Sequence, residues 1–348
     1  MTRRKKLLFA AAAMLLASGV ATVGLLAVDI YLHGKYERSA GYNIWGYRGP
    51  RVGSKKPNEI RVAVLGGSTA FGYGVTWEES IPALLEQKLS TPAQPVSVVN
   101  LGYNNEGAYS LRFTLDDYRW LDYDLAILYD GYNDLGYNAP DMNRQVYRRD
   151  SPLFRWTGYL PIFPIIFQEK AAALLSGGDV SGAYSKEKTV FRPGLAARGA
   201  AGVLGAAAGA GAALQEGLNS VATPTHMGEA IRQASDCETP WQIYCESVAA
   251  AIAHARQIGV DVMFVGQPAS LYPTQIKRHP HQQAQVAQMI ARRFGQDPRV
   301  RYASMADAVD LANEQLSFDG MHLTADGNRI VAERMAAVVR EFGLRRTR

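Results

Sequence analysis

A serine stands in a turn of small residues after the first buried strand that the sequence predicts. Gly66 and Gly67 precede Ser68, and Thr69 and Ala70 follow it. The carboxyl end of a strand in an α/β sheet is where such proteins place their ligands. A serine hydroxyl there can act as a nucleophile if a base lies within reach. Gly-Ser pairs are also common in ordinary turns, so the serine alone indicates little.

A second segment, just before the last predicted helix, carries the residue types that such a nucleophile needs. Asp319 and His322 are separated by Gly320 and Met321. A histidine can take the proton of a serine hydroxyl, while a carboxylate holds the imidazole in the right tautomer. The spacing lets one tight turn supply both groups. The alternative is a surface loop in which Asp319 starts a turn and His322 is incidental.

Two further turns follow predicted strands. Asn133, in the run D-G-Y-N-D after the third strand, has an amide that can donate to an oxyanion, although Asn-Asp is also ordinary turn chemistry. After the second strand, either Gly107 or Gly102 could direct a backbone N–H to the same point.

Five short apolar runs predict buried parallel strands. They are Arg61–Leu65, Val96–Leu101, Leu125–Tyr129, Asp261–Val265 and Val300–Ser304. Helical patterns lie between or after these runs, which predicts an α/β fold: a three-layer α/β/α sandwich around a five-stranded parallel sheet. The ends of parallel strands share one edge of the sheet, so we expect the four motifs to meet there.

Two threonines mark the starts of helices. Thr76 begins T-W-E-E, a capping box in which Glu79 reaches back to the cap. The helix after it has Ile81, Leu84, Leu85 and Leu89 on one face. Thr324 can cap the last helix, whose apolar side chains also repeat at helical spacing.

The amino terminus predicts a membrane anchor. Arg3, Arg4, Lys5 and Lys6 precede Leu7–Val28, in which no residue is charged. This stretch matches a hydrocarbon core of about 30 Å and is longer than the apolar core of a cleaved signal peptide. The basic cluster should stay in the cytoplasm. We therefore expect a single-pass membrane protein whose remaining domain lies in the periplasm or outside the cell, although a removed signal stays an alternative.

The sequence predicts three consecutive regions. Residues 1–30 form the basic tip and the transmembrane helix, 31–58 a juxtamembrane segment, and 59–348 the catalytic domain. An insertion at about 141–235 interrupts this domain, and its Ala/Gly-rich part at 196–214 is low in complexity. Cys237 and Cys245 are either a disulfide or two separate thiols, which the sequence does not decide.

The charge distribution argues against a nucleic-acid partner. The net charge of +5 comes from clusters at the two ends of the chain, and no basic stripe lies in its interior.

Taken together, the motifs resemble the SGNH hydrolase family, also called GDSL esterases, with the fold of a flavodoxin-like sandwich. The family has a serine turn after strand one, a glycine after strand two, G-x-N-D after strand three and D-x-x-H near the end. Here these blocks read GGST at Ser68, NNEGAYS at Gly107, GYND at Asn133 and DGMH at Asp319–His322. The first block departs from G-D-S-L, with Gly67 for Asp and Thr69 for Leu.

The resemblance implies roles for these residues. Ser68 would be the nucleophile, His322 its general base and Asp319 the group that orients His322. The oxyanion hole would comprise the backbone N–H groups of Ser68 and Gly107 and the side chain of Asn133, with Gly102 as the competing glycine. No metal or organic cofactor is implied.

Three functions follow as hypotheses. The first is a serine hydrolase that cleaves carboxylic esters through an acyl-enzyme, on a small-molecule or glycan substrate such as the O-acetyl groups of an envelope glycan. The second is an O-acyltransferase with the same triad, and the third is an inactive binding or assembly protein of the envelope. The sequence does not indicate the oligomeric state.

Overall fold

The computed structural model describes residues 2–37, 41–135, 144–166, 236–271 and 275–347. The chain divides into two compact units, which are described separately. One contains the described residues of Met1–Tyr36 and Ser151–Pro224, and the other those of Glu37–Asp150 and Thr225–Arg348.

The larger unit contains a five-stranded sheet in the order β2-β1-β3-β4-β5, with every neighbouring pair parallel. The strands are β1 Ile60–Gly66, β2 Val96–Asn100, β3 Leu125–Asp130, β4 Asp261–Gly266 and β5 Val300–Ser304. β1, β3 and β4 are buried along their whole length, as their apolar runs predict. The predicted parallel sheet is confirmed.

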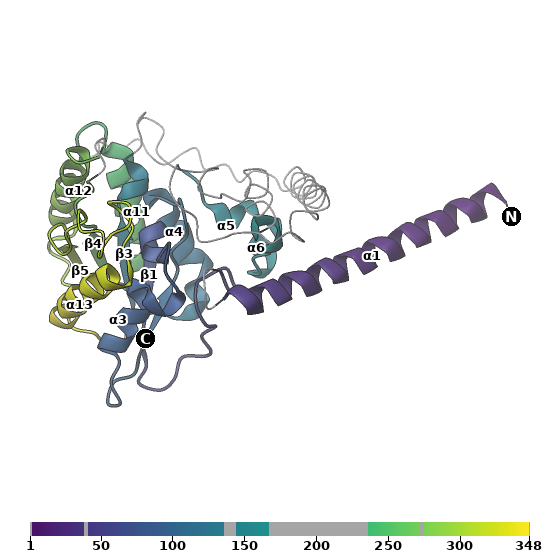
Figure 1. Cartoon of the computed structure of the whole chain (residues 1–348), viewed down its shortest axis with the longest axis horizontal. Helices are drawn as coiled ribbons and strands as arrows, with labels where there is room; N and C mark the ends of the chain where they lie inside the picture. Colours follow the sequence, from purple (N-terminus) through teal and green to yellow (C-terminus); the bar gives the residue numbers. More distant parts are fainter. Residues whose placement is uncertain (1, 38–40, 136–143, 167–235, 272–274, 348) are drawn as a thin grey trace. The chain divides into compact units, whose positions relative to one another are not determined.

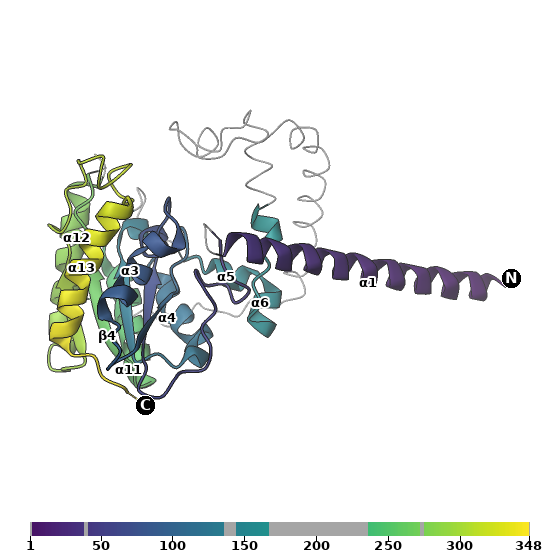
Figure 2. The same ribbon diagram turned by 60° about the horizontal axis from the view of Figure 1, so that its bottom comes forward.

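Helices cover both faces of this sheet (Figures 1 and 2). α3 (Ile81–Leu89) and α13 (Ala325–Phe342) pack together on one face. The other face carries α4 (Ala108–Asp117), α11 (Gln242–Gln257) and α12 (Arg278–Phe294). The predicted three-layer sandwich is therefore confirmed.

The layer between the sheet and the first pair of helices is a closed apolar core. Val62 and Val64 of β1 meet Leu85 of α3 and Met335 of α13, and all four side chains are fully buried. Each such side chain stabilises the fold by roughly 1.5–3 kcal/mol relative to an exposed one. The core thus fixes β1, whose end carries Ser68.

The predicted capping box begins a shorter element than expected. Glu79 accepts hydrogen bonds from the backbone N–H and the hydroxyl of Thr76, both at 2.9 Å, but this box opens only the 3₁₀ turn η1 (Trp77–Glu79). α3 starts anew after Ser80, with Pro82 in its first turn. A helix running through from Thr76 would place Pro82 in its interior, where proline removes a hydrogen bond and clashes with the preceding turn. Thr324 caps α13, as predicted.

Two short elements follow strands at the carboxyl edge of the sheet, α2 (Ser68–Phe71) after β1 and η3 (Tyr132–Asp134) after β3, whereas η2 (Arg119–Leu121) precedes β3. α5 (Tyr147–Asp150) follows in the same unit. Of the predicted insertion at 141–235, only residues 144–166 are described, and the Ala/Gly-rich stretch at 196–214 lies outside the described residues. Cys237 and Cys245 form a disulfide.

The smaller unit contains α1 (Arg3–Tyr36) and α6 (Pro152–Thr157). Among the described residues, α1 alone is long and apolar enough to cross a membrane. The predicted boundaries at residues 30 and 58 remain predictions.

Residues 42–52 of the larger unit hold the turn that follows Ser68. Arg48 is 1% exposed and donates to the carbonyl groups of Phe71 and Gly72 at 2.6 and 2.5 Å, while its guanidinium lies 4.3 Å from the centre of the Phe71 ring. Burial lowers the pKa of Arg48 to about 10, which leaves it a cation at neutral pH. This buried cation neutralises the carbonyl end of α2.

We expect Arg48→Ala to lower the free energy of unfolding by about 3 kcal/mol, because three charge-assisted hydrogen bonds, to the carbonyl groups of Phe71, Gly72 and Val75, are lost and buried carbonyl groups are left unpaired. Urea unfolding of the purified protein measures this difference. The exposed Arg51 provides the matched control, and Arg51→Ala should change the value by less than about 0.5 kcal/mol. Equal effects of the two substitutions would contradict the role of Arg48.

Candidate active site

The structure brings Ser68, His322 and Asp319 into one hydrogen-bonded chain at the carboxyl edge of the sheet. Ser68 Oγ lies 2.8 Å from His322 Nε2, and His322 Nδ1 lies 2.6 Å from Asp319 Oδ2. With a neutral imidazole, Nδ1–H donates to Asp319 and Nε2 accepts from the serine hydroxyl. This is the tautomer that a histidine needs in order to remove a serine proton.

The turn that carries Asp319 also holds its carboxylate in place. Asp319 Oδ1 accepts from the backbone N–H groups of Met321 and His322 at 3.0 and 2.6 Å. Burial alone would raise the pKa of Asp319, but the hydrogen bonds from the His322 ring and from these two N–H groups outweigh it and lower the pKa. Asp319 therefore stays ionised opposite the imidazole.

The serine turn approaches the end of β3 very closely. A Cβ atom at Gly67 would lie 2.1 Å from Asn133 Nδ2 and 2.9 Å from the carbonyl oxygen of Glu106. Only glycine fits between these groups in the turn as it is folded here. The close approach brings the amide of Asn133 beside Gly67, the residue that precedes Ser68.

The Asn133 amide is fixed by one of its two hydrogens. Nδ2 donates to the carbonyl oxygen of Glu106 at 2.7 Å. An amide NH₂ group has two donors, so this bond orients the side chain and leaves a second N–H to direct elsewhere.

The structure distinguishes the two glycines that follow β2. The N–H of Gly102 already donates to Asn100 Oδ1 at 3.0 Å. Gly107 instead follows the carbonyl that binds Asn133, and a Cβ atom there would lie 2.5 Å from Asp134 Oδ1. This geometry supports Gly107 rather than Gly102 as a donor beside Asn133.

Asp134, the last residue of G-Y-N-D, holds the segment around Gly107, a role that sequence reasoning did not assign. Its Oδ2 accepts from the backbone N–H of Ala108 at 2.8 Å, and its side chain hydrogen-bonds to that of Asp130. Both side chains are buried, and burial is the largest cause that raises the pKa of each, to about 7 for Asp130. Two buried carboxyl groups in contact are stable when one keeps its proton.

Gln267 was also missed, although it lies two residues after the predicted fourth strand, at the sheet edge where α/β proteins place their ligands. Its Nε2 donates to Thr69 Oγ1 at 2.6 Å, and its Oε1 accepts from the backbone N–H of Tyr132 at 2.9 Å. Gln267 thus bridges the serine turn and the G-Y-N-D turn.

Two exposed aromatic side chains flank the histidine. The ring centres of Tyr73 and Phe318 lie 5.0 and 5.8 Å from that of His322, and the two residues are 51% and 43% exposed. Tyr73 follows Ser68 by five residues and Phe318 directly precedes Asp319. The sequence did not reveal them, because single aromatic residues in loops form no recognisable pattern. They provide apolar surface next to the reactive groups.

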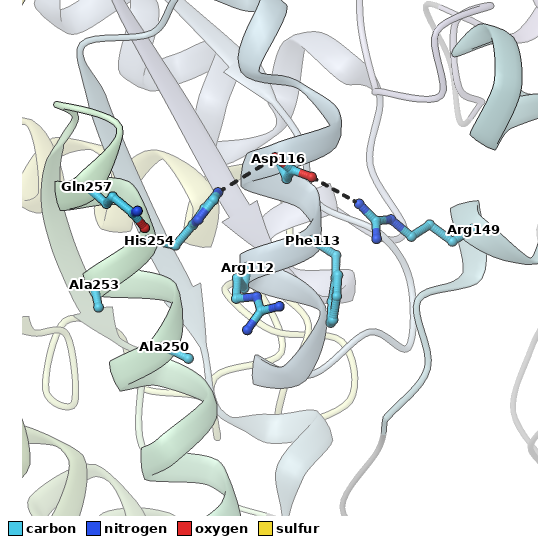
Figure 3. A pocket seen from close by; sticks show the side chains of 8 residues that line it. All are labelled: Arg112, Phe113, Asp116, Arg149, Ala250, Ala253, His254 and Gln257. Carbon is cyan, nitrogen blue, oxygen red and sulfur yellow. Dashed lines mark ion pairs between the residues drawn. The ribbon is translucent and has the colours of Figure 1, made fainter. Parts of the chain in front are cut away.

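A groove of about 500 Å³ lies between α4 and α11, with Arg112, Asp116 and His254 among its lining residues (Figure 3). Asp116 pairs with Arg149 at 3.5 Å and faces His254 at 3.9 Å. None of the lining residues is a serine or cysteine. The groove therefore does not compete with the Ser68 site as a place for nucleophilic catalysis.

The raised pKa of the buried pair predicts how stability depends on pH. The folded state keeps a proton that the unfolded chain releases above its ordinary pKa near 4, so the free energy of unfolding should fall as pH rises from about 4 to 7. Asp134→Asn leaves Asp130 beside a neutral amide, so this fall should become smaller. Urea unfolding at pH 5 and pH 8 measures it.

Glu314, an exposed carboxylate, gives the control: Glu314→Gln should show the same pH dependence as the unaltered protein. If Asp134→Asn also behaves like the unaltered protein, the retained proton is not on this pair.

Comparison with known proteins identifies the family of the chain. A profile of the GDSL-like Lipase/Acylhydrolase family matches residues 64–330. A search among curated proteins found no match.

Several solved structures are similar at low identity. A lipolytic protein of the G-D-S-L family from Desulfitobacterium hafniense has 12% identity and a TM-score of 0.43, over 80% of this chain and 99% of its own. An acetylxylan esterase from Geobacillus stearothermophilus has 11% identity and a TM-score of 0.41, over 83% and 96%. A GDSL-like lipase from Bacteroides thetaiotaomicron has 13% identity and a TM-score of 0.40, over 83% and 92%. Because the family profile spans more than half of the sequence, the chain belongs to the GDSL-like lipase/acylhydrolase family and is an ester-hydrolysing enzyme.

Proposed function

We propose that the protein is a serine hydrolase in which Ser68, His322 and Asp319 form the catalytic triad. The observation that carries this proposal is the 2.8 Å contact between Ser68 Oγ and His322 Nε2, with Asp319 on the far side of the ring. In the first step His322 takes the hydroxyl proton while Ser68 Oγ attacks the ester carbonyl. Asp319, held ionised, stabilises the imidazolium that forms.

The negative charge that develops on the carbonyl oxygen is bound by three donors. These are the backbone N–H groups of Ser68 and Gly107 and the free N–H of the Asn133 amide. The alcohol leaves with the proton from His322, and water then attacks the acyl-enzyme by the reverse sequence of proton transfers. The product is a carboxylic acid, and Ser68 is regenerated.

The substrate that we propose is an ester on the alcohol groups of a glycan of the cell envelope, such as an O-acetyl group. The exposed rings of Tyr73 and Phe318 support it, because flat apolar faces beside the histidine can pack against a sugar ring on the alcohol side of the ester.

We further propose that α1 anchors the enzyme in a membrane, with its basic tip in the cytoplasm and the catalytic domain in the periplasm or outside the cell. The four basic residues before α1 support this orientation. The disulfide between Cys237 and Cys245 supports it independently, since such bonds persist in oxidising compartments.

A fluorophosphonate probe tests the nucleophile. The folded protein should be labelled, and Ser68→Ala should lose the label and the release of acetate from a soluble acetyl ester. Asp319→Asn should lower kcat by about 10⁴-fold, because the imidazole is no longer held in the required tautomer. Equal labelling of the protein and of Ser68→Ala would contradict the proposal, provided that both give the same unfolding transition.

The oxyanion hole is tested at Gly67. In Gly67→Ala the added Cβ would displace the Asn133 amide, so kcat should fall about 10²–10³-fold, as for the loss of one oxyanion donor. Gly53→Ala is the matched control, because a Cβ there meets no atom within 4 Å. The rate of acetate release measures both. An unchanged kcat in Gly67→Ala would show that Asn133 does not contribute.

A further inference from the structure

The end of the apolar stretch in α1 is marked by an acidic residue that is buried. Leu7–Val28 spans about 33 Å at 1.5 Å per residue, close to the thickness of a hydrocarbon core, and Asp29 follows directly. Asp29 and His33 are each 1% exposed, whereas the residues before Asp29 in α1 are exposed. A carboxylate at this point needs partners that replace water.

These partners come from a segment more than 100 residues away in the sequence. Asp29 Oδ1 accepts from the backbone N–H groups of Ile162 and Phe163 at 2.8 and 2.6 Å, and Oδ2 accepts from the hydroxyl of Tyr159. His33 Nε2 lies 3.3 Å from Asp29 Oδ2 and 3.0 Å from the carbonyl oxygen of Leu160. Residues 159–163 are thus bound to the turn of α1 where its apolar stretch ends.

The chain on either side of this contact is apolar and partly exposed. Residues 160–166 read L-P-I-F-P-I-I. In α6, Leu153 and Trp156 lie three positions apart, which places them on one face of the helix, and they are 40% and 72% exposed. Pro152 and Phe154 of the same helix are buried.

We propose that residues 151–166 form a second membrane contact, held to α1 by Asp29, in which Leu153 and Trp156 enter the interface between lipid headgroups and acyl chains. The hydrogen bonds to Asp29 fix the segment at the level where a spanning α1 leaves the hydrocarbon. Tryptophan is enriched at that level, because its ring is apolar and its N–H is polar. The occupant of this surface is therefore the lipid bilayer that α1 crosses.

The proposal has a consequence for the fate of α1. Removal of the helix as a signal peptide would leave the N–H groups of Ile162 and Phe163 without their acceptor and the carbonyl oxygen of Leu160 without its contact to His33. The helix therefore stays on the mature protein. This inference rests on the proposed anchor but not on the proposed chemistry at Ser68.

The experiment uses the full chain in vesicles of phosphatidylethanolamine and phosphatidylglycerol, with single cysteines labelled by an environment-sensitive fluorophore. Cys237 and Cys245 are paired, so an added cysteine is the reactive thiol. The label at Trp156→Cys should be quenched several-fold more by nitroxide lipids than by iodide. Arg155→Cys, exposed on the same short helix, should show the opposite preference.

Two variants separate the steps of the inference. Leu16→Cys reports the anchor: a label there that iodide quenches would refute the span itself. Asp29→Ala should move the label at position 156 into water while the label at position 16 stays in lipid and acetate release from a soluble ester is unchanged.

The native tryptophan provides a check without a label. Quenching of tryptophan fluorescence by brominated lipids should decrease in Trp156→Phe. A label at position 156 that iodide quenches as strongly as the label at position 155 would overturn the proposal. Emission from position 156 that is typical of an apolar environment but is not quenched by any lipid quencher would also overturn it, because it would indicate a protein partner.

Discussion

The contact between the Ser68 hydroxyl and the His322 ring is the constraint on which the site depends, because 254 positions of sequence separate the two residues. The order of the strands makes this contact possible. β1 lies between β2 and β3, so the turn that carries Ser68 has the Gly107 segment on one side and the Asn133 turn on the other. A β1 at the edge of the sheet could have had only one of these neighbours. α13 packs on α3, and the segment before α13 then places His322 over the end of β1.

Because the turns after β1, β2 and β3 lie close together, several polar side chains are buried beneath the site. Three buried carboxyl groups lie close to Asn133 or Gly107 in the chain, those of Glu106, Asp130 and Asp134. Burial is the main cause that raises the pKa of each of the three. Glu106 faces the buried Arg148 at 3.5 Å, and its carboxylate accepts from the backbone N–H of Tyr147 at 2.9 Å. Apolar side chains of similar size would stabilise the fold at least as well. They could not accept the backbone N–H of Ala108 or Tyr147, and these two hydrogen bonds hold the chain at the starts of α4 and α5.

Much of this arrangement was predictable from the sequence, for physical reasons. The strands could be recognised because buried parallel strands are short, continuous apolar runs, and the meeting of the motifs followed from the common direction of the strands. The pairing of Cys237 with Cys245 and the hydrogen bond of the Gly102 N–H could not be recognised. The first depends on the distance between two side chains. The second depends on whether Asn100 folds back onto Gly102. Asp134 was visible as part of G-Y-N-D, but its bond to Ala108 joins turns that follow two different strands.

The smaller unit shows a second limit of prediction from the sequence. Composition identifies Leu7–Val28 as a candidate membrane span but cannot say what Asp29 does, because a charge at the end of an apolar stretch is ordinary. Its partners are made long after α1 has been synthesised, so Asp29 must remain hydrated until residues 159–163 reach it. A position at the level of the headgroups allows this, since water is available there and the carboxylate can exchange it for N–H donors. Further inside the hydrocarbon, the carboxylate would have no such solvent while it waited, and the order of synthesis would oppose folding.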